Sequence, residues 1–428
     1  MSVLIFLATL LFSLLAFASR AHAAPAPPSL PFRVVAYLPD YRAGTLDPAS
    51  GSLDGVTDLD GVTDLVFFSL EPTSDGGLDS ARLTPAIAAK LQDVKRRRAL
   101  HLWVTVGGWE RSAGFAPVAT DAAKRSRFVR AVTQFCLSRH FDGADFDWEH
   151  PANAPEEAGY ATLLAETHRA FAPHGLRLSV TLAPWQKPDP AGVAAVDTVN
   201  LMAYDHPGRH STLAQAQADV AGFLRQGVPP QKLCLGLPFY GRGIALRDTA
   251  LAYADILRQY HPAPAVDEVN GLYFNGPETI RQKTRYALAQ RLGGVMVWEL
   301  GQDAPGDKSL LKAIQKTIRQ AAVVLQDASL WYNGGEGETI MGSVRLDPKT
   351  AEKVRQVAAI KGLTLSEVHR LALAEYCERE LVEPKTSRYD DPFYDDIFGA
   401  IEGPHDMAAR SGEIYREVMD DKYRRHPD

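Results

Sequence analysis

The chain has 428 residues, 46% hydrophobic and 23% charged, a composition that excludes a disordered or fibrous protein and predicts one large domain plus something smaller. Its formal net charge of −6 argues against binding nucleic acid through bulk positive charge, although a small module can differ from this average. The cysteines, Cys136, Cys234 and Cys377, are too few and too widely spaced for a disulfide framework or a metal cluster.

The amino terminus has the pattern of a signal peptide. Residues 2–18 are apolar and uncharged, Arg20 follows, and Ala21-His22-Ala23 fits the small-x-small site of a signal peptidase. We therefore expect residues 1–23 to be a signal peptide, residues 24–32 to be a linker, and the protein to be secreted or periplasmic. An uncleaved membrane anchor is the alternative, because no Lys or Arg precedes the apolar run.

From residue 33 onward, short apolar or β-branched runs alternate with helical patterns. Alternating strands and helices favour parallel pairing, and eight such units predict an α/β fold, a closed (β/α)8 TIM barrel over residues 33–320. An open doubly wound sheet is the alternative, but no Gly-rich phosphate turn follows Leu38. The expected strands are 33–38, 64–70, 100–106, 143–149, 176–183, 198–204, 232–237 and 293–300, and the expected helices include 85–98, 122–137, 155–171, 212–226 and 277–291.

Three acidic residues, Asp145, Asp147 and Glu149, are spaced two apart on the expected fourth strand. A strand points all three to one face, which in a barrel is the interior at the carboxyl end. Like charges at a buried face are costly, so a functional role is favoured over a structural one. Crowded carboxylates raise the pKa of one member, as a general acid requires; a hard-metal site is the alternative, but further ligands are missing.

The chain resembles glycoside hydrolase family 18, the chitinase family, over roughly residues 33–320. Its fourth-strand motif DGxDxDWE is matched by DGADFDWE, and four further strings fall on the expected strands in the right order. Thr105 stands where the third-strand motif usually has Ser, which keeps the hydroxyl. The matching strings are DGADFDWE (142–149), TVGGW (105–109), NLMAYD (200–205), KLCLGLPFYGR (232–242) and GGVMVWELGQD (293–303).

The resemblance implies a substrate-assisted mechanism that needs neither a cofactor nor a metal. Glu149 would be the general acid and base. The substrate's own 2-acetamido group would be the nucleophile, with Asp147 orienting its N–H and Asp145 supporting Asp147. Tyr204 would donate a hydrogen bond to the acetamide oxygen.

The resemblance and the position of large side chains also suggest substrate-binding residues. Trp298 would form the apolar floor under the sugar ring, and Asp205 would lie near the same sugar. Filling of the barrel interior or plain surface exposure is the alternative for several of these side chains, above all Met202. The remaining candidates are Tyr37, Trp109, Trp185, Arg242 and Met202. Gly107 and Gly108 are expected to permit close backbone packing.

The segment between the seventh and eighth strands is shorter than in family members with a full α+β insertion. We therefore expect an open cleft, and chito-oligosaccharides, glycoprotein glycans and peptidoglycan-derived glycans all remain candidate substrates beside chitin. A non-catalytic chitin-binding protein on the same barrel is the alternative function, but Glu149 argues against it because lectin-like relatives typically lose the acid.

Beyond residue 320 the pattern changes. We expect a linker at 321–340, and residues 341–382 resemble the ribbon-helix-helix family of antitoxin-like DNA-binding regulators. So small a module would need a homodimer, with Ser343 and Arg345 facing DNA; an ordinary helical hairpin is the alternative. Residues 383–428, a tail with five more acidic than basic residues, would suit a protein partner.

An exported hydrolase has no access to an operator, so nucleic acid is a partner only if this module acts in the cytoplasm. One hypothesis removes the conflict. Residues 334–338, GGEGE, are what a purine-rich ribosome-binding site would encode in frame, so Met341 would be the start of a second gene fused to the first.

Overall fold

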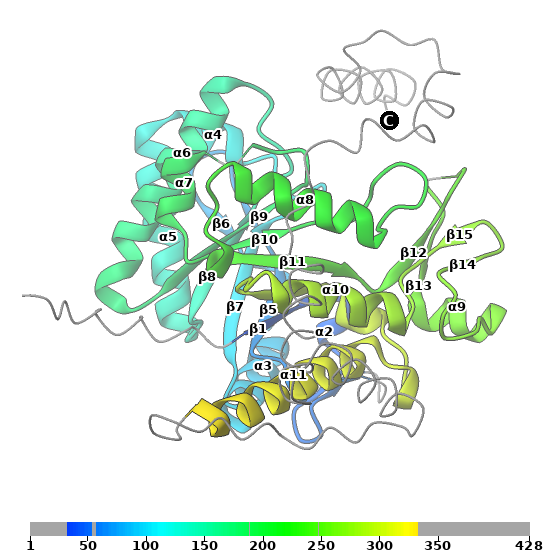
Figure 1. Cartoon of the computed structure of the whole chain (residues 1–428). Coiled ribbons are helices and arrows are strands. Elements are labelled where there is room, and N and C mark those ends of the chain that lie inside the picture. Colours follow the sequence, from blue (N-terminus) through cyan, green and yellow to red (C-terminus); the bar gives the residue numbers. More distant parts are fainter. Residues whose placement is uncertain (1–31, 54–56, 188, 247, 333–428) are drawn as a thin grey trace, which may run out of the picture. The chain divides into compact units, whose positions relative to one another are not determined.

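The computed structural model describes residues 32–332 apart from 54–56, 188 and 247 (Figure 1). The chain divides between Ala322 and Val323, and the first unit contains the barrel. The predicted signal peptide, the ribbon-helix-helix-like module with Ser343 and Arg345, and the acidic tail lie outside the described residues. Within the described ranges, no helix has both the length and the apolar character needed to cross a membrane.

Eight parallel strands close into a barrel, as the alternation of strand and helix patterns predicted. The last strand pairs with the first, and the first also pairs with the second, Val35 lying opposite Asp64, so the ring has no open edge. This confirms the (β/α)8 barrel and excludes the open doubly wound sheet. The strands are β1 (Arg33–Pro39), β5 (Asp64–Pro72), β7 (His101–Gly107), β8 (Gly143–Asp147), β9 (Arg177–Leu182), β10 (Thr198–Leu201), β11 (Leu233–Pro238) and β16 (Gly294–Trp298).

Helices surround the barrel, and the predicted helical segments are all helical. Side chains of Thr84, Asp121, Asn153, Asp189 and Thr212 accept backbone N–H groups at five helix starts, which explains where these helices begin. The helices are α2 (Asp40–Ala43), α3 (Pro85–Arg98), α4 (Phe115–Thr120), α5 (Ala122–Arg139), α6 (Ala154–Phe171), α7 (Pro190–Ala195), α8 (Leu213–Arg225), α9 (Tyr253–Tyr260), α10 (Pro277–Ala289) and α11 (Leu310–Tyr332), with 3-10 turns η1 (Ala172–His174), η2 (Pro230–Lys232), η3 (Leu300–Gln302) and η4 (Gly306–Lys308). The helix α11 therefore continues through the first part of the expected linker at 321–340.

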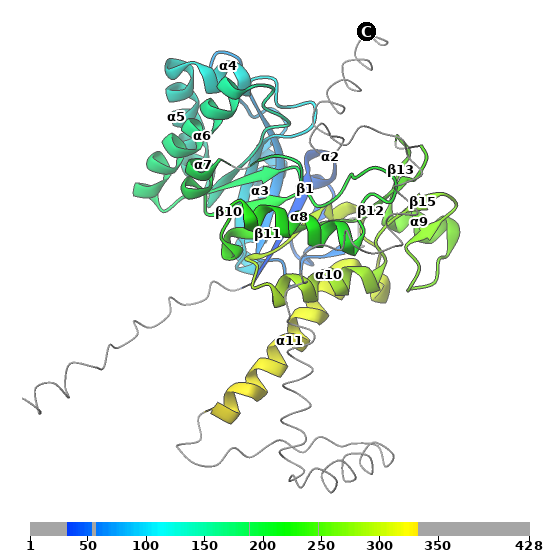
Figure 2. The same cartoon turned by 45° about the horizontal axis from the view of Figure 1, so that its top comes forward.

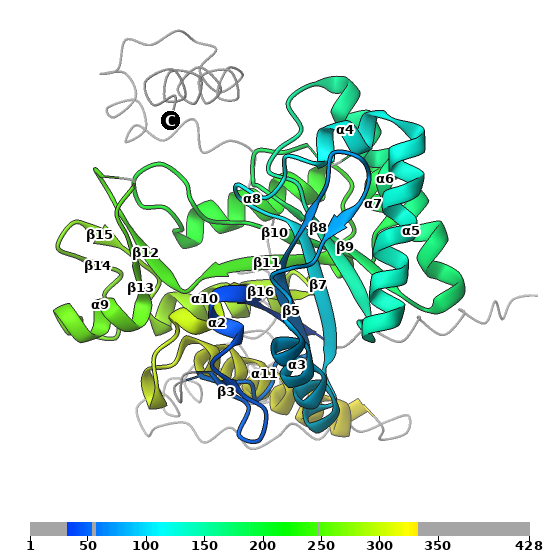
Figure 3. The ribbon, with the colours of Figure 1, turned by 180° about the vertical axis from the view of Figure 1, so that it is seen from behind.

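The segment between β11 and β16 forms a small antiparallel sheet with one helix, α9. Its strands are β12 (Tyr240–Gly243), β13 (Ala250–Ala252), β14 (Glu268–Val269) and β15 (Leu272–Tyr273), in the order β13-β12-β15-β14. This sheet lies on the opposite side of the barrel from α4 to α7 (Figures 1 and 3). The remaining strands are β2 (Leu46–Asp47), β3 (Ser52–Leu53) and β4 (Thr57–Asp58), which pair with one another, and β6 (Leu78–Asp79), which pairs with β5.

Two apolar clusters hold the barrel together. The larger one fills the space between strands and helices, and includes Ala144, Phe146 and Trp148 from the fourth strand and its exit. Phe115 stacks on Trp148 at 5.5 Å between ring centroids, and this fixes the chain just where it leaves β8. The smaller cluster fills the barrel interior and consists of Val35, Tyr37, Val66, Phe68, Trp103, Tyr204, Cys234, Tyr240 and Met296, with Met202 and Trp298 packed against it.

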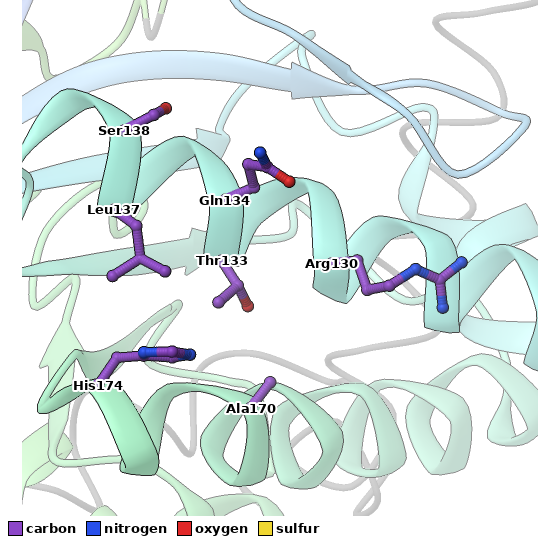
Figure 4. A pocket seen from close by; sticks show the side chains of 7 residues that line it. All are labelled: Arg130, Thr133, Gln134, Leu137, Ser138, Ala170 and His174. Atoms are coloured by element: carbon purple, nitrogen blue, oxygen red, sulfur yellow. The ribbon is translucent and has the colours of Figure 1, made fainter.

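The outer surface has a hollow of about 680 Å³ between α5 and the end of α6 (Figure 4). Arg130, Leu137 and Ser138 line it from α5, and Ala170 and His174 from the facing segment. The lining contains none of the predicted site residues, so this hollow is separate from the carboxylates described next.

Candidate active site

Asp145 is completely buried at the centre of the barrel interior, where hydroxyl and amide groups from four other strands surround it. These donors favour its ionised form, but burial is the stronger effect and raises the pKa of Asp145. The side chain is therefore held in one orientation by its neighbours. The donors are Tyr37 (2.8 Å) on β1, Thr105 (3.2 Å) on β7, Ser179 (2.6 Å) and Thr181 (3.0 Å) on β9, and Asn200 (3.2 Å) on β10.

Asp147 is also buried, but its carboxylate has a free acceptor atom. Among the described residues, none donates a hydrogen bond to Asp147 Oδ1. Its backbone carbonyl accepts from the Gly108 N–H at 2.6 Å and from Ser112 Oγ at 3.0 Å, which ties the end of β8 to the loop after β7. Burial, followed by the charges of Glu149 and Asp145, raises the pKa of Asp147 well above its ordinary value. A buried, unpaired acceptor at this point can receive an N–H group from a ligand.

Glu149 lies two residues beyond the end of β8. Its carboxylate accepts the Trp109 backbone N–H, and its own N–H donates to Ser112 Oγ at 3.1 Å. Burial, and next the negative charge of Asp205, raise the pKa of Glu149 to about 7. The sequence predicted crowding as the cause, but the structure puts burial first. A carboxyl group with this pKa is half protonated near neutral pH and suits general acid and base chemistry.

Asp205 is the charged neighbour of Glu149, and it is held ionised. It accepts hydrogen bonds from Tyr240 (2.6 Å) and from two nitrogens of Arg242, and His210 Nδ1 lies 3.6 Å away. Burial acts to raise the pKa of Asp205, but these cationic and hydrogen-bonding neighbours outweigh it and hold the pKa below its usual range. Arg242, predicted to bind substrate, therefore contacts Asp205.

Aromatic side chains line the interior next to the carboxylates. Tyr204 is buried, and its hydroxyl lies 3.8 Å from Met296 Sδ. Trp298 is half-buried and meets Phe68 edge-on, with ring centroids 4.6 Å apart. Met202 packs against the same interior cluster. The floor of the candidate site is thus apolar beside the buried acids, which suits the C–H face of a sugar.

Tyr37, a substrate-binding candidate from the sequence, is packed in the barrel interior, which was the alternative for this side chain. The side chain is only 1% exposed, its ring lies 5.7 Å from that of Trp298, and its hydroxyl contacts Asp145 and Thr181. Its position depends on hydrogen bonds to β8 and β9, and its contact with the site runs through Asp145.

Among the residues that the structure describes, the exposed large aromatic side chains are Tyr41 (62%), Trp109 (51%) and Trp185 (49%). Trp109 and Trp185 are among the substrate-binding candidates from the sequence, and their binding role stays a prediction, whereas Tyr41 was not among the candidates. Trp185 lies edge-on to His150, with ring centroids 4.6 Å apart. Burial lowers the pKa of His150 to about 4, so this imidazole, 3.7 Å from Glu149, is neutral at pH 7.

The paired glycines at the end of β7 serve close packing, as predicted. Both have φ near +100°, a region that side chains rarely adopt. A Cβ on Gly107 would lie 2.2 Å from the Asp147 carbonyl oxygen, and one on Gly108 would lie 2.2 Å from the Phe68 ring. The loop after β7 can approach Asp147 only because both side chains are absent.

Sequence reasoning missed several polar residues that organise the site. Ser179 and Thr181 alternate inward along β9, a signal that the strand pattern contained. Ser112 bridges the loops after β7 and β8, and no sequence pattern pointed to this role. In the described ranges, no group of three His, Cys, Asp or Glu side chains is arranged to hold a metal ion.

Known proteins have similar sequences. The profile "Glycosyl hydrolases family 18" matches residues 33–303. "Probable chitinase 10" of Drosophila melanogaster is 27% identical over 300 residues, which cover 52% of this chain and 13% of that protein. The chain spans less than two thirds of the length of the curated relatives that it matches most strongly.

Solved structures of chitinases have a similar fold. The GH18 chitinase ChiB from the chitin utilization locus of Flavobacterium johnsoniae is 25% identical with a TM-score of 0.59, covering 68% of this chain and 94% of that one. A plant class V chitinase mutant from Cycas revoluta in complex with (GlcNAc)3 has the same TM-score at 23% identity, a likeness of fold, covering 67% of this chain and 99% of that one. Since the family profile matches more than half of its length, the chain belongs to family 18 of the glycosyl hydrolases.

Proposed function

We propose that the barrel hydrolyses β-linked N-acetylglucosamine glycans by substrate-assisted, retaining catalysis. The observation that carries the proposal is the pairing of Glu149, whose pKa is raised to about 7, with Asp147, whose Oδ1 has no donor among the described residues. The first can give a proton at neutral pH, and the second can receive an amide N–H.

In the first step, Glu149 donates its proton to the glycosidic oxygen while the bond between that oxygen and the anomeric carbon breaks. The carbonyl oxygen of the 2-acetamido group forms a bond to the anomeric carbon from the opposite face. Asp147 accepts the acetamide N–H, and the negative charge of the buried acids balances the positive charge that develops on the oxazolinium ring. Tyr204 donates its hydroxyl to the acetamide oxygen and orients it for attack.

In the second step, Glu149 takes a proton from water, whose oxygen attacks the anomeric carbon and opens the oxazolinium ring. Two inversions give net retention, so the first product is the β-anomer. Hydrogen-bond donors fix Asp145 in the barrel interior, and from this position Asp145 supports Asp147. Trp298 supports the ring on its apolar face.

Chito-oligosaccharides are the proposed substrates. The family and the chitinases named above support this choice, as does the exposure of Trp109 and Trp185 at the ends of the strands. Peptidoglycan fragments and N-linked glycoprotein glycans also contain N-acetylglucosamine and are alternative outcomes of the substrate test.

The decisive experiment compares turnover of N-acetylglucosamine oligomers by wild type, Glu149→Gln and, as a control, Glu157→Gln, an exposed glutamate on α6. We expect Glu149→Gln to lose about 10²- to 10⁴-fold in kcat and Glu157→Gln to match wild type. Glucose oligomers, which lack the acetamide, should not be cleaved. Equal rates in wild type and Glu149→Gln would refute the mechanism, and binding without turnover by wild type would favour the carbohydrate-binding alternative.

Export and the carboxyl-terminal segment complete the proposal. We propose that residues 1–23 direct the barrel out of the cytoplasm, on the basis of their apolar run and small-x-small site.

A second function, DNA binding by a homodimer through residues 341–382, rests on sequence pattern alone. Amino-terminal sequencing of the native product tests export, and its intact mass tests the gene-fusion hypothesis: a separate polypeptide starting at Met341 supports the fusion, and one secreted species with the full carboxyl terminus contradicts it.

A further inference from the structure

The side chain of Lys283, on α10, is completely buried and contacts the loop that follows β10. Its Nζ donates to the Ser211 carbonyl (2.8 Å), to Ser211 Oγ (2.7 Å) and to Asn275 Oδ1 (2.7 Å). An ammonium group has three hydrogens to donate, so all of them are used. Across the described part of the chain, no carboxylate is within ion-pair distance of this nitrogen.

Burying a lysine without a carboxylate partner is costly. Burial lowers the pKa of Lys283 to about 7, and Asp267 and Asp219, which favour its charged form, offset only part of that effect. A methionine of similar length would fill the same space on α10 without the desolvation penalty. What Lys283 adds to the fold is therefore its set of hydrogen bonds. The helix that carries it packs against α8, beside the barrel (Figure 2).

These hydrogen bonds lead to the residues proposed to contact the acetamide group. Ser211 Oγ, which accepts from Lys283, donates in turn to the Ala203 carbonyl at 2.8 Å. Ala203 immediately precedes Tyr204 and Asp205 in the chain. The strand β10 ends before this segment, and the N–H groups of Ala203 and Tyr204 donate to the carbonyls of Leu201 and Met202, two residues earlier, rather than to a neighbouring strand.

We propose that Lys283 is a positioning residue for hydrolysis, which through Ser211 and Ala203 fixes Tyr204 and Asp205 relative to Glu149. The inference rests on the proposed function, because it gives Tyr204 the role of acetamide donor. Displacing such a donor by about 1 Å costs on the order of 100-fold in rate.

The test compares Lys283→Met with a matched control, Thr284→Val. Thr284 is the next residue on α10 and equally buried, but its hydroxyl donates to the Ile280 carbonyl within the helix. The substrate is an aryl chito-oligosaccharide with a good leaving group, whose cleavage reports on attack by the acetamide more than on protonation by Glu149. We expect Lys283→Met to lose roughly 10- to 100-fold in kcat with little change in KM, and Thr284→Val to stay within about twofold of wild type.

A double-mutant cycle separates positioning from general stability. In a Tyr204→Phe background the donor is already gone, so we expect Lys283→Met to cost much less than it does in wild type. Ser211→Ala removes the hydroxyl that links Lys283 to the Ala203 carbonyl, but keeps the bonds from Lys283 to the Ser211 carbonyl and to Asn275. Its effect on kcat should likewise be much smaller in the Tyr204→Phe background than in wild type. Additive losses in the cycle, or wild-type kcat in Ser211→Ala, would overturn the inference even if Lys283→Met does not fold.

Glu149→Gln distinguishes this failure from failure of the proposed function. If Glu149→Gln turns over N-acetylglucosamine oligomers as fast as wild type, the mechanism itself is wrong. If Glu149→Gln is inactive while Lys283→Met has wild-type kcat, only the role of Lys283 is wrong.

Discussion

Burial, and after it the ionised carboxylate of Asp205, raise the pKa of Glu149. The two residues come from the exits of different strands, β10 and β8. Arg242 and Tyr240 hold Asp205 ionised through hydrogen bonds, so its charge persists over the range in which Glu149 titrates. The pKa of Glu149 therefore depends in part on Asp205, a residue at the exit of another strand.

Replacing Asp205 with Asn should move the alkaline limb of the pH–kcat profile to lower pH. Glu149 acts as an acid only while protonated, so activity falls as the pH rises through its pKa. Removing a nearby negative charge stabilises the ionised form and lowers that pKa. Rates measured across pH for the variant and for Asp255→Asn, an acid on α9 paired with Arg258, test this. An unmoved limb in Asp205→Asn would contradict it.

Glu149→Gln should be more stable than wild type at pH 8 and equally stable at pH 4. The folded-state pKa, about 7, lies above the ordinary value of 4.5, so the folded protein holds a proton that the unfolded chain releases. Stability therefore falls as the pH rises from about 4.5 to about 7, by at most about 3 kcal/mol. Urea denaturation at both pH values measures the difference. For the control Glu157→Gln, the difference from wild type in the free energy of unfolding should be the same at pH 8 as at pH 4.

Tyr37→Phe should lower both activity and stability without changing the shape of the interior. The hydroxyl donates to Asp145, so its loss leaves that carboxylate with one donor fewer. We expect a cost of about 1–2 kcal/mol in the free energy of unfolding, since the group is fully buried. A reduced kcat with unchanged KM would agree with action through Asp145, whereas a raised KM alone would favour direct binding of substrate by Tyr37.

Gly107→Ala should abolish activity, whereas Gly175→Ala should only reduce stability slightly. Both glycines have positive φ, but a Cβ at Gly107 would meet the Asp147 carbonyl oxygen at 2.2 Å, and one at Gly175 would meet nothing within 4 Å. Gly175→Ala therefore carries only the backbone cost, about 1 kcal/mol. Thermal unfolding and turnover of both variants test the comparison. Equal effects would show that contact with Asp147 is unimportant.

The period of two along a strand determined, from sequence alone, that Asp145 and Asp147 face the interior while Phe146 and Trp148 face the helices. Motif order likewise predicted which strand exits would carry the site, because parallel strands all end at the same rim of a closed barrel. These are local or periodic properties, which the sequence expresses directly.

Tertiary structure alone decided how each acid is tuned. Glu149 lies beyond the end of β8, so Trp109 and Ser112 from another loop set its position, and Asp205 from a third loop supplies the like charge that raises its pKa after burial. Whether the Tyr37 ring would face a sugar or Asp145 depended on the strands beside it. Desolvation and hydrogen bonding depend on which atoms meet in space, and those atoms belong to segments far apart in the chain.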